Sequence, residues 1–130
     1  MAIDNIKVLL IDDDPNVRLT VKSMLEEMNV TKIVEAADGQ TAIDYFDDHS
    51  NDIDLIICDW NMPHKTGLEF LNYVRKSHKD LPFLMSSARA DEESIISAKL
   101  SNVTAYLSKP YSFGDLNEKI NAIVNNNTDS

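Results

Sequence analysis

The sequence predicts an α/β domain in which helices cover both faces of a parallel sheet, a three-layer sandwich. Short apolar runs alternate along the chain with segments in which apolar residues recur at helical spacing. Two of the runs, 7–11 and 54–58, are almost wholly apolar, as expected of central strands that are covered on both faces. Five such β/α units with right-handed crossovers fit in 130 residues.

The expected strands are short and are separated by helical segments. Strands are predicted at residues 7–11, about 32–36, 54–58, 82–86 and 105–108. Apolar residues that share one helical face indicate four helices: Val17, Val21, Met24, Leu25 and Met28; Ala42, Ile43 and Phe46; Leu68, Leu71 and Val74; and Phe113, Leu116, Ile120 and Ile123. A further helix at about 92–100 has only a blurred stripe of Ile95, Ile96, Ala98 and Leu100.

Residues that favour helix ends support the same boundaries. Asp14 suits the N-cap of the first helix, and Pro15 suits its first position. Asn102 readily takes the left-handed conformation that ends a helix. We therefore expect one domain over residues 1–124, followed by a polar tail, 125–130, that frays or begins a linker.

Composition and charge narrow the possible partners. With 43% hydrophobic residues in 130, the chain suffices for one domain with a core and not for two. A net charge of −10 disfavours nucleic acid or an anionic membrane and favours a protein or a cation. No apolar run approaches the roughly 20 residues that span a bilayer, and the single cysteine, Cys58, is expected to be a buried thiol. These features predict a cytoplasmic protein.

Acidic residues follow two of the predicted strands. Asp12 and Asp13 come after the first strand, and Asp59 comes after the third. Because the carboxyl ends of parallel strands share one edge of the sheet, these carboxylates are expected to converge. Carboxylates that lie so close repel each other unless one is protonated or a hard cation binds, and Mg²⁺ is the natural candidate. Acidic turns are also common at strand ends, and we interpret Asp14 as a helix cap.

Further groups at the same edge suit phosphoryl chemistry. A carboxylate can attack phosphorus and form an acyl phosphate if positive charge offsets the repulsion between the two anions. Lys109, at the end of the fifth strand and directly before Pro110, supplies such a charge. The fourth strand ends at Ser86 and Ser87, whose hydroxyls can donate to a phosphoryl oxygen, although serine at a strand end is commonly a turn residue.

The full set of motifs resembles the receiver domain of bacterial two-component response regulators. The set comprises Asp12-Asp13, Asp59-Trp-Asn-Met-Pro63, Ser87-Ala88, Tyr106 and Lys109-Pro110, in this order and at these intervals. The resemblance covers about residues 6–124, and its closest likeness is to single-domain chemotaxis regulators. It implies a flavodoxin-like receiver fold with the strand order 2-1-3-4-5.

The resemblance implies a phosphoacceptor and its metal ligands. Asp59 would accept the phosphoryl group. Mg²⁺ would be bound directly by Asp13, Asp59 and the backbone carbonyl of Asn61, and by Asp12 mostly through a water molecule. The family tunes phosphate lifetime at Asn61 and Arg89, and Arg89 stands where close relatives often carry an acid.

It also implies how the modification is detected. Ser87, in place of the more frequent threonine, would hold the phosphoryl group, and Lys109 would neutralise it from a cis Lys109–Pro110 peptide. Tyr106 would be a switch residue whose ring turns inward when Ser87 moves toward the phosphate; a half-buried amphipathic ring is the alternative. Residues 102–105, Asn-Val-Thr-Ala, occupy a stretch that is usually richer in glycine and alanine in the family. We expect His49, His64 and His78 to be surface residues.

The resulting functional prediction is a signalling receiver and not an enzyme with a separate substrate. A histidine kinase would phosphorylate Asp59, and the monomeric domain would then change its affinity for a downstream protein target, the flagellar motor switch or another effector. Two alternatives remain: an aspartate-based phosphatase of the haloacid dehalogenase type, matched only by Asp12-x-Asp14, and a receiver-like module that takes no phosphate. A flavodoxin-like cofactor binder requires a less acidic loop than the one that follows the first strand.

Overall fold

The structure is a parallel sheet with a layer of helices on each face. The computed structural model describes residues 3–62, 65–88 and 91–128. Its strands are β1 (Lys7–Ile11), β2 (Lys32–Ala36), β3 (Leu55–Asp59), β4 (Phe83–Ser87) and β5 (Ala105–Ser108). Its helices are α1 (Pro15–Glu27), α2 (Gly39–His49), α3 (Gly67–Arg75), α4 (Glu92–Leu100) and α5 (Phe113–Thr128), with short 3-10 helices η1 (Ile3–Asn5) and η2 (Ser50–Asp52).

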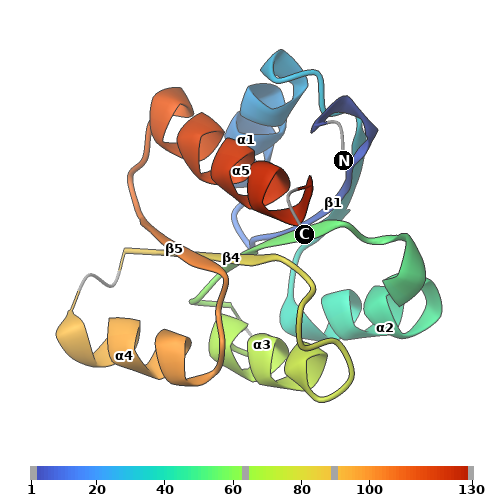
Figure 1. The fold of residues 1–130 in the computed structure, drawn as a ribbon. Coiled ribbons are helices and arrows are strands. Elements are labelled where there is room, and N and C mark those ends of the chain that lie inside the picture. Colours follow the sequence, from blue (N-terminus) through green and yellow to red (C-terminus); the bar gives the residue numbers. More distant parts are fainter. Residues whose placement is uncertain (1–2, 63–64, 89–90, 129–130) are drawn as a thin grey trace.

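The strand order confirms the predicted fold. Across the described residues the strands pair in the order β2-β1-β3-β4-β5, and every pairing is parallel. Helices α1 and α5 cover one face of the sheet, and α2, α3 and α4 cover the other (Figure 1). No helix in the described part of the chain is long and apolar enough to cross a bilayer.

Two strands begin and end one residue later than predicted. Asp54 directly precedes β3, and it is bound to the start of β1: its side chain accepts the Lys7 backbone N–H at 2.8 Å, and its own N–H donates to the Lys7 carbonyl at 2.9 Å. At the other end Asp59 pairs with Ser86, and β4 continues to Ser87. The later boundaries make Asp59 and Ser87 the last residues of their strands.

The predicted helix signals are largely confirmed. Asp14 caps α1 by accepting the Asn16 N–H at 2.9 Å, and Asn102 has a positive φ of 64° just after α4. Helix α5 extends to Thr128 and therefore includes the first residues of the polar 125–130 segment.

The sheet separates two hydrophobic clusters. On the side of α1 and α5, the buried strand residues include Val8, Leu10, Leu55, Ile57 and Leu84. On the side of α2, α3 and α4, they include Leu9, Ile11, Ile56, Cys58 and Met85. Cys58 is fully buried, as predicted, and burial together with the charges of Asp59 and Asp12 raises the pKa of its thiol.

The predicted apolar stripe of α4 is wrong at Ile96 and Leu100, although Ala98 is buried and Ile95 is half-buried. The helix buries Ser94 and Ala98, which lie one turn apart, whereas Ile96 and Leu100 lie on the opposite face and are 47% and 83% exposed. Asp91 caps the helix by accepting the Ser94 N–H at 2.9 Å. Small side chains therefore make the contact between α4 and the sheet.

The histidines differ in their surroundings. His49 is exposed, as predicted, and stacks on Tyr45 with 4.3 Å between ring centroids. His78 is half-buried, and its ring meets the Phe46 ring edge-on with 5.0 Å between ring centroids. It therefore takes part in packing and is not a free surface residue. The prediction for His64 lies outside the described residues.

Helix α3 begins in close contact with the end of β3. Thr66 and Glu69 form a capping box at its N-terminus, and the Gly67 N–H donates to the Trp60 carbonyl at 2.8 Å. A Cβ atom at Gly67 would lie only 2.4 Å from the Asp59 carbonyl oxygen and 2.9 Å from the Trp60 Cα. Glycine at this position therefore lets the backbone around Asp59 pack against α3.

Gly67→Ala should destabilise the fold by about 1–3 kcal/mol, because the added methyl group overlaps backbone atoms that cannot move independently of β3. Urea unfolding measures the loss. Gly114→Ala is the matched control: its Cβ would lie 3.6 Å from the nearest atom, and helical alanine should leave stability unchanged or raise it by up to about 1 kcal/mol. Equal effects of the two substitutions would contradict this explanation.

Candidate functional site

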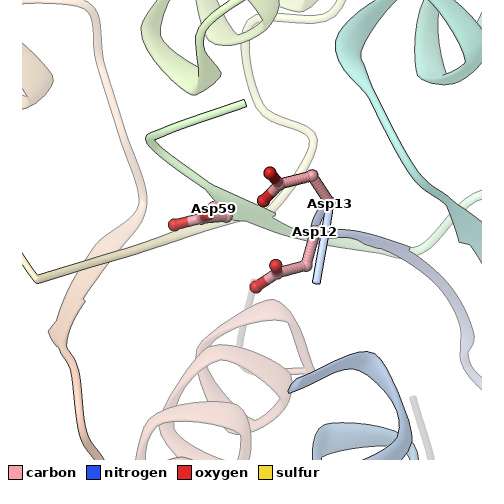
Figure 2. A group of neighbouring side chains, drawn as sticks. All are labelled: Asp12, Asp13 and Asp59. Carbon is pink, nitrogen blue, oxygen red and sulfur yellow. The ribbon is translucent and has the colours of Figure 1, made fainter. Parts of the chain in front are cut away.

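Three carboxylates meet at the carboxyl edge of the sheet. Asp12 and Asp13 follow β1, Asp59 ends β3, and these two strands are neighbours that pair Ile11 with Cys58. One carboxylate oxygen from each aspartate lies within 4.8 Å of the others. Figure 2 shows the three side chains together at the strand ends. Asp12 and Asp59 are buried, whereas Asp13 is exposed, so the cluster opens to solvent on one side.

Lys109 lies between the two buried carboxylates. It follows β5, and its backbone N–H donates to the Ser87 carbonyl at 2.8 Å. Its Nζ is 2.8 Å from Asp12 Oδ2 and 3.2 Å from Asp59 Oδ1. Side chains alternate along a strand, so Asp12, Asp59 and Lys109 are expected on the side of the sheet that faces α1 and α5, where the residues two positions earlier are buried. The predicted convergence of carboxylates and lysine is thus present.

The ion pairs also determine how Lys109 titrates. Burial lowers the pKa of Lys109, but its hydrogen bond to Asp12 and the charges of Asp59 and Asp12 outweigh burial and raise the pKa above its ordinary value. The stabilisation that this shift represents is complete below the ordinary lysine pKa and is lost as the pH rises through the raised value. Lys109 is therefore a cation at neutral pH.

Asp59 remains short of positive charge despite this lysine. Burial raises its pKa, Lys109 lowers it, the charge of Asp12 raises it, and a hydrogen bond from the Asn61 backbone lowers it; the net pKa is raised. The carboxylate is consequently ionised at a cost in folding free energy. A cation that binds beside it would recover that cost.

Asp12 is held by hydrogen bonds from both its backbone and its side chain. Its backbone N–H donates to the Ala36 carbonyl at 3.1 Å, its Oδ1 accepts the Asp14 N–H at 2.9 Å, and its Oδ2 accepts from Lys109. Asp14 itself is exposed and caps α1, so its carboxylate takes no part in the cluster. The separation of roles between Asp12 and Asp14 agrees with the sequence prediction.

The serines end β4 beside Asp59. Ser86 is paired with Asp59, and its hydroxyl lies 3.5 Å from the Cys58 carbonyl. Ser87 is fully buried and is paired with Ser108 of β5. Ser87 is therefore at the predicted strand end, and its contact with a phosphoryl group stays a prediction.

Tyr106 contacts the residue that follows Asp59. It lies in β5 opposite Met85, is half-buried, and meets the Trp60 ring edge-on with 6.4 Å between centroids. Trp60 is buried, and its backbone N–H donates to the Ser86 carbonyl at 2.9 Å. The sequence indicated that Tyr106 has a role but did not predict its contact with Trp60. The two residues are 46 positions apart, and no local pattern shows that their rings meet.

The structure describes some of the remaining predicted site positions but not all of them. Asn61 is exposed directly after Trp60, and the Lys109–Pro110 peptide is cis as expected. Arg89 lies outside the described residues. Sequence reasoning missed Tyr111, which is partly buried near the cluster; burial and the charges of Asp12 and Asp59 raise its pKa. Its position directly after Lys109-Pro110 was the available signal.

Comparison with known proteins identifies the family. Residues 8–121 match the family model for the response regulator receiver domain. The chain belongs to this family. It is 39% identical over 119 residues to the chemotaxis protein CheY of Pseudomonas aeruginosa, covering 90% of this chain and 94% of that protein. It is 36% identical over 121 residues to CheY-3 of Vibrio cholerae, with 92% of each chain covered.

A solved structure agrees with this assignment. The response regulator TrrA of Thermotoga maritima, determined in complex with Mg²⁺-BeF, is 31% identical, with a TM-score of 0.80 and coverage of 91% of this chain and 98% of that one. This receiver is thus homologous to chemotaxis regulators, which are signalling proteins and not conventional enzymes. Neither the phosphatase nor the phosphate-free alternative is favoured, and the Asp12-x-Asp14 match fails because Asp14 is a cap.

Asp59→Asn should raise the unfolding midpoint of the metal-free receiver at pH 7. The substitution keeps the size of the side chain and removes a buried charge whose raised pKa shows that its ionisation opposes folding. Since protonation relieves the same cost in the wild type, the gain should shrink as the pH falls toward about 4. Urea unfolding at several pH values measures it. Asp13→Asn, at an exposed position, should give a smaller gain. A loss of stability in Asp59→Asn would show that the charge of Asp59 does not oppose folding.

Proposed function

We propose that the receiver is switched by phosphorylation of Asp59. A histidine kinase would donate the phosphoryl group from phosphohistidine, and the modified domain would change its affinity for a downstream protein target such as the flagellar motor switch. One observation carries the assignment: Asp59 ends a central strand beside two further carboxylates, with Lys109 Nζ 3.2 Å away. The domain would act as a monomer in the cytoplasm and catalyse only its own phosphotransfer and dephosphorylation.

The acidic cluster suits Mg²⁺. Its donors are hard carboxylate oxygens, and their spread of 4.8 Å or less is close to the roughly 4.2 Å between opposite ligands of an octahedral Mg²⁺. Asp13, Asp59 and the Asn61 carbonyl would bind the ion directly. Asp12, whose oxygens accept hydrogen bonds from the Asp14 N–H and from Lys109, would act mostly through water. When bound, the ion would neutralise charge on the phosphoryl oxygens and on the carboxylates.

Phosphotransfer then requires a nucleophile and a way to offset negative charge. A carboxylate oxygen of Asp59 would attack phosphorus as the phosphorus–nitrogen bond of phosphohistidine breaks and the imidazole leaves with the bonding electrons. The product is an acyl phosphate. Lys109 and the Ser87 hydroxyl would bind its oxygens, and hydrolysis by water would return phosphate and the Asp59 carboxylate. Asn61 and Arg89 would influence how long the acyl phosphate survives.

Tyr106 would report the modification at the surface. If Ser87 moves toward a phosphoryl group on Asp59, space opens beside the Tyr106 ring, which already contacts Trp60. A partner that prefers one ring position would favour the phosphorylated form by its difference in affinity for the two states. We place the partner surface on α4, β5 and α5, around Ile95, Lys99, Tyr106 and Lys119.

Acetyl phosphate with Mg²⁺ should add one phosphoryl group to the wild-type receiver, and Asp59→Asn should abolish at least about 90% of that mass gain. The reason is that an amide cannot serve as the nucleophile in place of the carboxylate. Intact-mass spectrometry at several time points provides the measurement. Asp48→Asn, an exposed aspartate on α2, is the control and should be modified like the wild type. An undiminished gain in Asp59→Asn would refute the site assignment.

Asp13→Ala should weaken Mg²⁺ binding about tenfold or more, whereas Asp14→Ala should change it by less than about threefold. Asp13 would be a direct ligand, while Asp14 is occupied as the cap of α1. Trp60 adjoins Asp59, so quenching of its fluorescence during a Mg²⁺ titration reports binding. Similar losses in the two variants would show that the division between ligand and cap is wrong.

A further inference from the structure

Arg18 holds the backbone of the acidic loop from the α1 side. Its Nη1 donates to the Asp12 carbonyl oxygen at 2.7 Å, and its Nε donates to Glu35 Oε1 at 3.3 Å. The Arg18 side chain is only 19% exposed. One guanidinium thus connects α1, the end of β2 and the loop after β1.

The carbonyl that Arg18 binds belongs to the peptide group between the two acidic residues. Because this group is planar, fixing the direction of the Asp12 carbonyl also constrains ψ of Asp12 and φ of Asp13. Those torsions determine where the two carboxylates point. Asp12 has additional anchors in the Asp14 N–H and Lys109, whereas Asp13 is exposed, so its direction depends more on the peptide group.

We propose that Arg18 is a positioning residue for the cation site. By holding the Asp12–Asp13 peptide group, it keeps the Asp13 carboxylate directed at the cluster and so increases the affinity for Mg²⁺. The inference rests on the proposed function, since it takes Asp13 as a ligand of the ion.

Glu35 orients the arginine. Its Oε2 lies 3.7 Å from Lys22, and its side chain is 37% exposed, so these ion pairs contribute little stability in themselves. Their effect is to hold the planar guanidinium where a second nitrogen reaches the Asp12 carbonyl. Lysine has a single cationic nitrogen and cannot serve both partners with the same geometry.

The charge of Arg18 acts in the opposite direction to its proposed role. Removing the positive charge of Arg18 from the neighbourhood of the acidic cluster should by itself strengthen the binding of Mg²⁺, because like charges repel. Losing the hydrogen bond to Asp12 should instead weaken binding, because the carboxylates are no longer aligned. The sign of the change therefore distinguishes positioning from charge, and a general loss of stability has no reason to weaken the metal affinity of the folded fraction.

The test compares Arg18→Met with Lys22→Met. Arg18→Met keeps an apolar stem and removes both hydrogen bonds, whereas Lys22→Met removes the neighbouring cation that shares Glu35. Mg²⁺ alone is titrated against each full-length variant, with Trp60 fluorescence and calorimetry as readouts, and circular dichroism in EDTA measures the folded fraction. Arg18→Met should bind Mg²⁺ about tenfold more weakly, the usual scale for losing a group that supports a metal ligand. Lys22→Met should bind as the wild type does or more tightly.

Unchanged or tighter binding by folded Arg18→Met overturns the inference and leaves the proposed function intact. A wild-type receiver that does not bind Mg²⁺ overturns both. If Arg18→Met does not fold without metal, Arg18→Lys decides: this variant keeps the charge, and affinity weaker than wild type supports positioning, whereas wild-type affinity overturns it.

Discussion

The site depends on one lysine that lies between two buried carboxylates. Lys109 contacts Asp12 at 2.8 Å and Asp59 at 3.2 Å, and without it two like charges would be desolvated side by side. Its charge is not sufficient, because the pKa of Asp59 is still raised, chiefly by burial. The folded domain therefore retains a requirement for more positive charge at this edge of the sheet. The same requirement explains why a divalent cation would suit these residues, and why a phosphoryl group on Asp59 would need such a cation beside it.

The fold brings this chemistry into contact with an aromatic pair. Asp59 is followed by Trp60, whose ring meets Tyr106, and Gly67 allows the backbone at the end of β3 to pack against α3. A change at Asp59 thus has a short physical route to the half-buried ring of Tyr106 on β5. On the other side, Arg18 and Glu35 connect the acidic loop to α1 and β2. The aspartates are accordingly constrained from both sides of the sheet.

The sequence predicts the elements best where one local pattern determines burial. The apolar runs of β1 and β3 are covered on both faces, and the Asp14 cap and the Asn102 helix end follow from local backbone chemistry. The local pattern does not predict the burial of α4, because this helix packs through Ser94 and Ala98 while Ile96 and Leu100 are exposed to solvent. The cluster of aspartates and Lys109 was predictable because parallel strands share an edge. The Arg18 and Trp60 contacts were not, because each joins residues whose separation in space depends on tertiary packing.

Urea unfolding of Lys109→Met with and without Mg²⁺ shows whether Lys109 compensates the charge of the two buried carboxylates. If Lys109 compensates the buried carboxylates, the variant should be less stable than the wild type in EDTA, and saturating Mg²⁺ should raise its midpoint by more than it raises the wild-type midpoint, since the ion replaces the missing charge. Lys99→Met, which removes an exposed lysine of α4, should show the wild-type response. The same Mg²⁺ increment in Lys109→Met and wild type, or no loss of stability in EDTA, would contradict the account.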